Sequence, residues 1–122
     1  DAIITGDLGY VGKEILTEMA ETQGYNIKNN YNDCGVLIFD KDAQDTHAGG
    51  SGCGCVGSVF SGYFYKKLKE KSINRLLLIA TGALMNSTSS QQGESIPGIA
   101  HAIAIENLVF GDGGKKQDFG NK

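Results

Sequence analysis

Short apolar blocks alternate with helix-like segments along this chain. Continuous apolar runs predict strands at Ala2–Thr5, 35–39, 75–81 and 99–106. Between them, apolar residues at helical spacing predict a helix from Tyr10 to Thr22, ended by Gly24, and a second from Cys53 to Glu70. The segments 26–33 and 82–97 are polar and predict connections. Strands that alternate with helices indicate an α/β fold in layers, with a mostly parallel sheet.

The second predicted helix lacks a charged outer face. Its first three turns carry Val56, Val59, Phe60, Tyr63 and Phe64 among glycines and serines, and the first charge comes at Lys66. A helix without a polar face is normally buried on all sides. In a small α/β domain this predicts that something else packs on its far side, either a missing half of the chain or a partner subunit.

Composition narrows the class of protein. The chain has 122 residues with 18 glycines and one proline, 40% hydrophobic and 20% charged residues, and a net charge of −3. No Gly-X-Y period exists, so collagen is excluded, and the apolar content excludes a disordered linker. The length suits one small domain. The abrupt start within an apolar strand suggests a fragment, and the tail after Gly111 has little apolar content and is expected to be loose.

Charge and cysteine patterns exclude further classes of partner and site. The basic residues between Lys66 and Lys71 are interrupted by Glu70, so no nucleic-acid footprint is predicted. The three cysteines, Cys34, Cys53 and Cys55, form no disulfide framework and are expected to pack as small apolar residues. No metal site and no cofactor are predicted. The uncharged run 48–65 contains too many glycines and serines for a transmembrane helix.

One motif supports an enzyme interpretation. Gly6, Gly9 and Gly12 follow a strand and open a helix, with the spacing of a dinucleotide-binding turn, and Asp40 could bond a ribose hydroxyl. Tyr63 and Lys67 even have the catalytic spacing of short-chain dehydrogenases. Tyr63 follows the glycine turn too early for a complete nucleotide-binding half, however. Close helix–strand packing is the favoured explanation of these glycines.

Longer strings resemble one family, stage V sporulation protein AD. They are 3–9, Asp33-Cys34-Gly35, 45–55, 80–84 and 89–102. The resemblance covers residues 1–106 as one domain and leaves 107–122 as a loose tail. It implies the C-terminal half of a thiolase and ketoacyl-synthase-like fold. In that fold the helix after the glycine loop is buried in a central layer between two sheets.

The resemblance also bears on catalysis. Condensing enzymes of this superfamily carry a histidine where this chain has Gly6, and an asparagine in the pair that is here Gly49-Gly50. These side chains stabilise the enolate and its oxyanion. The nucleophilic cysteine belongs to the other half of the fold. We therefore expect a non-catalytic relative, with an active acyl-CoA condensing enzyme as the alternative and an NAD(P)-binding dehydrogenase-like domain as a weaker one.

The family resemblance implies a function in bacterial spores. It implies binding of dipicolinic acid, free or as its calcium chelate, and its movement across the inner spore membrane with membrane proteins of the same operon. The protein would be peripheral on that membrane. Its own N-terminal half, or another copy, would pack on the central helix. From loop positions, the expected ligand-binding residues are Thr5, Gly6, Asp7, His47, Gly49, Gly50, Ser51, Gly52, Thr81 and Gly82.

Overall fold

The computed structural model describes residues 1–50, 52–83 and 86–108. A four-stranded sheet runs through the molecule, in the order β2-β1-β3-β4. The strands are β1 (Ala2–Thr5), β2 (Tyr31–Asp33), β3 (Arg75–Ala83) and β4 (Gly98–Glu106). β1 pairs in parallel with β2 and β3, and β4 is antiparallel to β3. The chain is thus a small α/β domain with a mixed, mostly parallel sheet, as the sequence pattern predicts.

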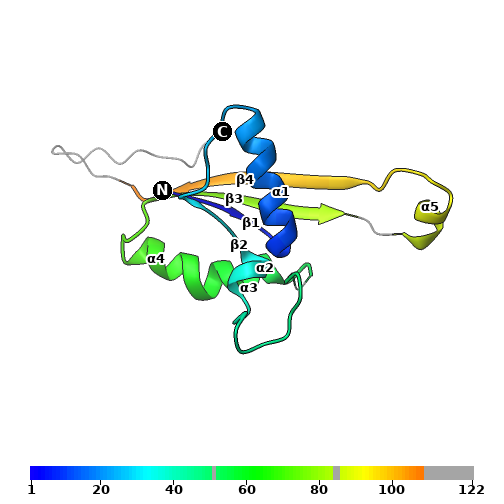
Figure 1. The fold of residues 1–122 in the computed structure, drawn as a ribbon. Helices are drawn as coiled ribbons and strands as arrows, with labels where there is room; N and C mark the ends of the chain where they lie inside the picture. The colour runs from blue at the N-terminus through cyan, green and yellow to red at the C-terminus, as the bar shows by residue number, and fades with distance from the viewer. Residues whose placement is uncertain (51, 84–85, 109–122) are drawn as a thin grey trace, which may run out of the picture.

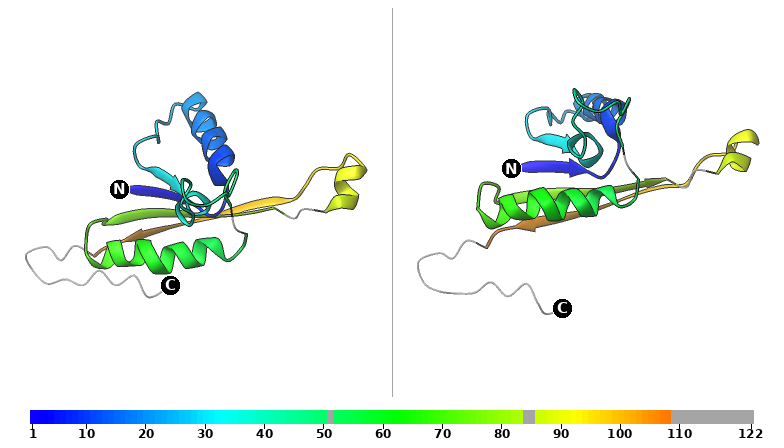
Figure 2. Two further views of the ribbon diagram at one scale, coloured as in Figure 1. Left: turned by 60° about the horizontal axis from the view of Figure 1, so that its bottom comes forward. Right: turned by 90° about the horizontal axis from the view of Figure 1, so that it is seen from below.

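Helices lie on both sides of this sheet, and one, α5, lies beyond the ends of β3 and β4 (Figure 1). They are α1 (Gly9–Thr22), α2 (Cys34–Leu37), α3 (Cys55–Val59), the π-helical segment η1 (Phe60–Phe64), α4 (Tyr65–Lys69) and α5 (Ser87–Gln91). The segments α3, η1 and α4 follow one another without a break, and we call them together the central helix. α1 lies on one side of the sheet and the central helix on the other (Figure 2).

The second predicted strand is wrong. Residues 34–37 form α2, and the strand lies earlier, at Tyr31–Asp33, inside the segment predicted to be a polar connection. The reason is that β2 is buried through hydrogen bonds rather than apolar packing. The Tyr31 hydroxyl lies 2.8 Å from the Thr5 hydroxyl, and Asp33 is wholly buried. A polar strand satisfied in this way carries no apolar signal in the sequence.

The other strands and the long helices match the predictions closely. α1 begins one residue before the predicted start, at Gly9, and β1 has the predicted bounds. β3 continues two residues beyond Thr81, and the segment 82–97 contains α5 in place of an uninterrupted loop. Asn86 caps that helix, because its side chain accepts a hydrogen bond from the Thr88 amide.

The apolar core lies between the sheet and the central helix. Ile4, Leu76 and Leu78 of the sheet are 2–9% exposed and pack with Val59, Phe64 and Leu68 of the helix. Cys34 and Cys55 are buried in the same cluster, as expected for small apolar residues, whereas Cys53 is exposed. Burial of this face is the main contribution to the stability of the domain.

The far side of the central helix is open in the described chain. Gly57, Ser58, Ser61 and Gly62 are exposed, and Tyr63 and Tyr65 are 43% and 57% exposed. The predicted burial on all sides is therefore not met by these residues alone, because the central helix has one sheet against it and not two. The apolar face of α1 is open as well, with Val11, Ile15 and Met19 each more than half exposed.

The structure describes only the first two residues of the predicted tail. Asn107 is held in place, since its side-chain amide donates to the carbonyl oxygens of Leu68 and Ile73. The predicted loose tail lies mostly outside the described residues.

Among the residues that the structure describes, no helix has both the length and the apolar character needed to cross a bilayer.

Candidate functional site

Three segments of backbone meet at the carboxyl ends of β1 and β3. They are the turn Gly6–Gly9 after β1, the loop residues Gly49 and Gly50, and Thr81–Gly82 near the end of β3. Gly6 lies against Thr81, and Gly50 lies beside Asp7. The structure thus brings together six of the ten predicted ligand-binding residues: Gly6, Asp7, Gly49, Gly50, Thr81 and Gly82.

Glycine is required where these segments touch. A Cβ atom on Gly9 would overlap with the carbonyl oxygen of Ala48, and one on Gly35 would lie 2.8 Å from the Gly50 Cα atom. Gly9, Gly49 and Gly50 also have positive φ angles of 73°, 75° and 87°. Such angles are unfavourable for residues with a side chain. Part of the glycine enrichment therefore serves backbone packing around this site.

A buried carboxylate fixes the turn. Asp33 is 0% exposed and accepts three hydrogen bonds: from the Thr5 hydroxyl at 2.5 Å, and from the amides of Leu8 and Gly9 at 2.9 Å each. These amides stand at the beginning of α1, where a helix has unpaired N–H groups and favours negative charge. Asp33 therefore caps α1 from a neighbouring strand. Asp7, which lies next to this helix start in the sequence, does not cap it: its carboxylate accepts a hydrogen bond from the Thr81 hydroxyl.

This cap contradicts the nucleotide interpretation of the glycine turn. The Asp7 amide donates to the Thr81 hydroxyl, the Leu8 and Gly9 amides to Asp33, and the Tyr10 amide to the Ala48 carbonyl. None of these four amides is left for a phosphate. Asp40, the proposed ribose ligand, is exposed and accepts hydrogen bonds from its own loop, at Asp42 and Ala43.

The pair with dehydrogenase-like spacing, Tyr63 and Lys67, lies away from the glycine turn. Tyr63 and Lys67 lie on the central helix, with the Lys67 ammonium group 4.5 Å from the centre of the Tyr63 ring. That helix lies on the opposite side of the sheet from α1 (Figure 2). The pair is a surface cation–π contact on one helix.

A shallow depression opens beside the cluster. It is lined by Asp7, Leu8, Thr81, Gly82, Ala83, Gly98, Ile99 and Ala100. Asp7 is the one charged residue in this lining, and its carboxylate accepts a hydrogen bond of 3.4 Å from the Thr81 hydroxyl. The depression thus combines one carboxylate, one hydroxyl and apolar walls.

The remaining predicted ligand residues do not reach this depression. The Thr5 hydroxyl is buried against Asp33 and Tyr31. His47 is exposed and lies 3.7 Å from Asp45, in a separate loop hollow lined by residues 41–47. Gly52 is exposed at the entry to the central helix, and Ser51 lies outside the described residues. Thr5 and His47 therefore do not line this depression.

Two residues that organise the cluster, Asp33 and Gly35, were not among the predicted site residues. The sequence did contain a signal for both, because a carboxylate at Asp33 and a glycine at Gly35 flank the apolar residue Cys34. It could not be interpreted without the fold, because the donors that Asp33 binds are 24 to 28 residues away in the chain.

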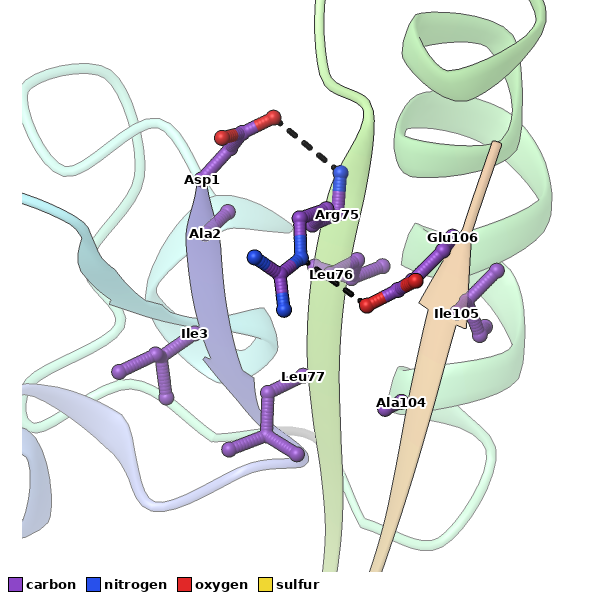
Figure 3. A pocket seen from close by; sticks show the side chains of 9 residues that line it. All are labelled: Asp1, Ala2, Ile3, Arg75, Leu76, Leu77, Ala104, Ile105 and Glu106. Atoms are coloured by element: carbon purple, nitrogen blue, oxygen red, sulfur yellow. Dashed lines mark hydrogen bonds and ion pairs between the residues drawn. The ribbon is translucent and has the colours of Figure 1, made fainter. Parts of the chain in front are cut away.

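A second depression lies at the other end of β1 (Figure 3). Ala2, Ile3, Leu77 and Ala104 form its apolar floor, with Arg75 and Glu106 at its rim. The Arg75 guanidinium donates to Glu106 at 2.9 Å, and Asp1 accepts from the Arg75 amide at 3.1 Å. Arg75 and Glu106 are paired with each other, and the Asp1 carboxylate accepts hydrogen bonds from backbone amides, so this depression offers less to a charged ligand than the Asp7 depression.

Burial also determines the chemistry of Cys34. Removal from water raises the pKa of the Cys34 thiol from its ordinary value of 9.0 to about 12, with smaller contributions from nearby Cys55 and Asp33. The thiolate, which is the nucleophile, is therefore strongly disfavoured in the folded protein.

Thiol labelling should separate the cysteines. In the folded chain we expect a thiol reagent such as DTNB to react rapidly with exposed Cys53 and slowly with buried Cys34 and Cys55. In denaturant all three should react. Because the folded pKa of Cys34 is raised, its proton stabilises the fold below about pH 9, and this stability should fall as pH rises from 9 towards 12. Rapid labelling of Cys34 in the folded protein would contradict the buried cluster.

Comparison with known proteins points to the same family that the sequence strings described above resemble. The family model of stage V sporulation protein AD matches residues 1–106. The chain belongs to this family. The stage V sporulation protein AD of Bacillus subtilis (strain 168) is 43% identical over 106 residues, which are 87% of this chain and 31% of that relative. The family is one of sporulation proteins.

The match includes every segment of the site. The glycine turn, Asp33, the loop at Gly49–Gly50 and Thr81 all lie within the 106 residues that match the stage V sporulation protein AD family. The chain spans less than a third of the length of the Bacillus relative. What the whole relative does in the spore is therefore carried to this chain only as a proposal.

Proposed function

We propose that this member of the stage V sporulation protein AD family binds dipicolinic acid without catalysing a reaction. The observation that carries the non-catalytic part is the packing of Gly6. A Cβ atom at Gly6 would lie 2.9 Å from the Thr81 hydroxyl oxygen and 3.1 Å from the Thr81 amide nitrogen. A histidine, the side chain that condensing relatives have at this position, has no room there unless β3 moves.

The second catalytic position supports the same proposal. Gly50 has a φ of 87° and lies next to the Asp7 carbonyl oxygen, where an added Cβ would be 3.4 Å away. Any side chain at such an angle is strained. Without the histidine and asparagine side chains, an enolate or oxyanion would lose its usual hydrogen-bond donors. The acyl-condensing alternative therefore has less support.

The ligand would enter the Asp7 depression, and its charge matters. Dipicolinate is a flat dianion at neutral pH, and Asp7 would repel it. The neighbouring turn cannot compensate, because its amides are used by Asp33 and Thr81. A calcium ion held by the ligand would reverse this interaction, since Ca²⁺ prefers carboxylate oxygens and has room for several. We therefore propose the calcium chelate as the bound form, with Asp7 as a calcium contact.

The start of the central helix offers further backbone donors. Among the described residues, the amides of Cys53 and Gly54 have no hydrogen-bond acceptor, and they precede a helical run of 15 residues, 55–69. Carboxylates are stabilised at such helix starts. The Thr81 hydroxyl donates to Asp7 and holds this carboxylate at the depression, and Ile99 and Leu8 supply apolar walls for the ligand ring.

Calorimetry of the full natural-length protein with dipicolinate, with and without calcium, tests this proposal. We expect binding in the presence of calcium, and at least a tenfold loss of affinity in Asp7→Asn, which removes the calcium contact. The same variant should bind the calcium-free dianion no worse than the natural protein, because a repulsion is removed. Unchanged calcium-dependent affinity in Asp7→Asn would place the ligand elsewhere.

A matched pair of variants tests the Gly50 position. Gly50→Asn should weaken binding, since it places a side chain beside Asp7. Gly24→Asn is the control, because Gly24 has a similar φ of 88° but has nothing within 4 Å of an added Cβ. Both substitutions carry the same backbone strain. Equal effects of the two on affinity would argue against a ligand at Gly50.

The wider assembly remains a proposal as well. The open side of the central helix would be covered by the N-terminal half of the protein, or by another copy, and this cover would complete the buried central layer. The family resemblance further implies membrane partners from the same operon at the inner spore membrane. Spore fractionation tests the location: the protein should sediment with the inner-membrane fraction, and recovery only from the spore core would exclude it.

A further inference from the structure

The face of β3 and β4 on the α1 side of the sheet is apolar and exposed. Successive side chains of a strand point to opposite faces, and Leu76 and Leu78 pack on the central helix, so Leu77 faces the side of α1. Leu77 is 37% exposed. The register places Ala104 opposite Leu77, and the same face continues through two more exposed alanines of β4, Ala102 and Ala100. Leu77 and these alanines form a floor of small apolar side chains.

The exposed face of α1 forms a wall beside this floor. Lys13 lies on the β2 side of α1, because its ammonium group donates to the Asn32 side chain. Helix residues two positions apart lie on nearly opposite sides, so Val11 and Ile15 point away from β2, towards β3. With their neighbours they make the apolar stripe Leu8, Val11, Ile15 and Met19. We call the space between this wall and the floor the α1 trough.

The two depressions described above lie at the ends of the α1 trough. Leu8 and Ala100 line the Asp7 depression, near the carboxyl end of β3. Leu77 and Ala104 lie on the floor of the other depression, which Figure 3 shows. The wall from Leu8 to Met19 spans 11 residues of rise, or about 16 Å, and this is about three turns of helix. The trough therefore matches the length of an ordinary packed helix.

The α1 trough needs a cover of its own. An exposed apolar surface that joins a helix stripe to a sheet face is normally covered in a folded protein. The cover proposed above for the central helix cannot serve, because that helix lies on the opposite side of the sheet (Figure 2).

We propose that, in the full natural-length protein, a helix from outside residues 1–122 lies in the α1 trough. The matched residues are 31% of the Bacillus relative, so more than two thirds of its length remains to supply this helix. A segment of the same protein would cover the trough permanently, whereas a separate protein would leave it open until it binds. The alanine floor admits large apolar side chains on the covering helix.

Charge argues against a second copy as the occupant. Glu14 and Glu18 are exposed, and each lies three residues from a member of the wall, Val11 or Ile15. If α1 of a second copy filled the trough, its own Glu14 and Glu18 would approach these carboxylates, and such like-charge contacts are unfavourable. The same carboxylates favour lysine or arginine at the border of the covering helix.

Thiol labelling of the full natural-length protein tests the proposal, in a Cys53→Ser background that removes the exposed cysteine. Ile15→Cys places a thiol on the wall of the trough. Glu21→Cys is the control, because Glu21 lies on the polar side of α1 and pairs with Lys28. We expect DTNB to react with folded Ile15→Cys at least tenfold more slowly than with Glu21→Cys, and equally fast with both in denaturant.

Two outcomes of this labelling would overturn the proposal. Similar rates for the two folded variants would show that the trough is open in the purified protein. Slow labelling of Ile15→Cys that becomes fast on dilution would assign the cover to a second copy. Neither readout involves a ligand, so both are independent of dipicolinate binding.

A substitution in the floor gives a second test. Ala102→Leu adds a larger side chain, which an open trough would accept and a covered trough would not, because overpacking destabilises a packed interface. We expect the melting temperature of the full natural-length protein to fall by several degrees. Ala43→Leu, in an exposed loop, is the control and should leave it unchanged. An unchanged melting temperature in Ala102→Leu would contradict a packed cover.

Discussion

Replacing Asp33 by alanine should cost the domain about 3 kcal/mol of unfolding free energy or more. The carboxylate is completely buried and accepts hydrogen bonds from the Thr5 hydroxyl and from the amides of Leu8 and Gly9. Alanine leaves these three donors without an acceptor in a site where water has little access. Each buried polar group without a partner costs about 1–3 kcal/mol.

Urea unfolding followed by circular dichroism measures this loss. Asp40→Ala is the control, because the Asp40 side chain also accepts two backbone hydrogen bonds, from Asp42 and Ala43, but in an exposed loop where water replaces it. Its effect should stay within about 1 kcal/mol. Equal effects of the two substitutions would mean that burial adds nothing to the role of Asp33. The depression beside Asp7 should also lose its shape in Asp33→Ala, because Asp33 holds the turn that carries Asp7.

Gly9→Ala is expected to have the second large effect, again about 3 kcal/mol or more, if the variant folds at all. Two costs combine here. The φ of 73° is unfavourable for alanine, and the added methyl group would overlap with the Ala48 carbonyl oxygen, which accepts the hydrogen bond of the Tyr10 amide. The loop at Gly49 would have to move away from α1, and that loop forms part of the candidate site.

Gly24→Ala separates the two costs of that substitution. Gly24 follows α1 with a φ of 88° and has open space around it, so alanine there suffers only the backbone strain, about 1 kcal/mol. The difference between the two variants in thermal or urea unfolding measures the steric part at Gly9. Similar losses in both would show that the loop yields easily and that the close contact with Ala48 is unimportant.

The elements that the sequence predicted well are those with a clear apolar pattern. The helical spacing of Val11 and Ile15 located α1 to within a residue, and the apolar run after Arg75 located β3. The prediction failed at β2, where Tyr31 and Asp33 are buried by hydrogen bonds, and at 34–37, where an apolar run forms a short helix. An apolar pattern does not mark a strand that is buried through hydrogen bonds, and it cannot distinguish a strand from a helix over so few residues.

The predictions for the candidate site were likewise met for some residues and not for others. Loop position alone placed Gly6, Asp7, Gly50 and Thr81 together, because the carboxyl ends of parallel strands meet at one edge of a sheet. It also placed Thr5 and His47 there, whereas in the structure the Thr5 hydroxyl faces Asp33 and His47 lies in a separate loop hollow. Whether a hydroxyl faces a ligand or a buried carboxylate depends on side-chain direction, which the chain order does not record.

By itself, the sequence determined the α/β class, the family and the enrichment of glycine around two loops. Only the tertiary structure decided what those glycines do. Gly9 and Gly35 allow backbone segments distant in the chain to touch, and Asp33 occupies the helix start that appeared ready for an anion. The physical reason is that a contact between Leu8 and Asp33, or between Gly9 and Ala48, is fixed by distances in the folded chain, and residue order carries no measure of those distances.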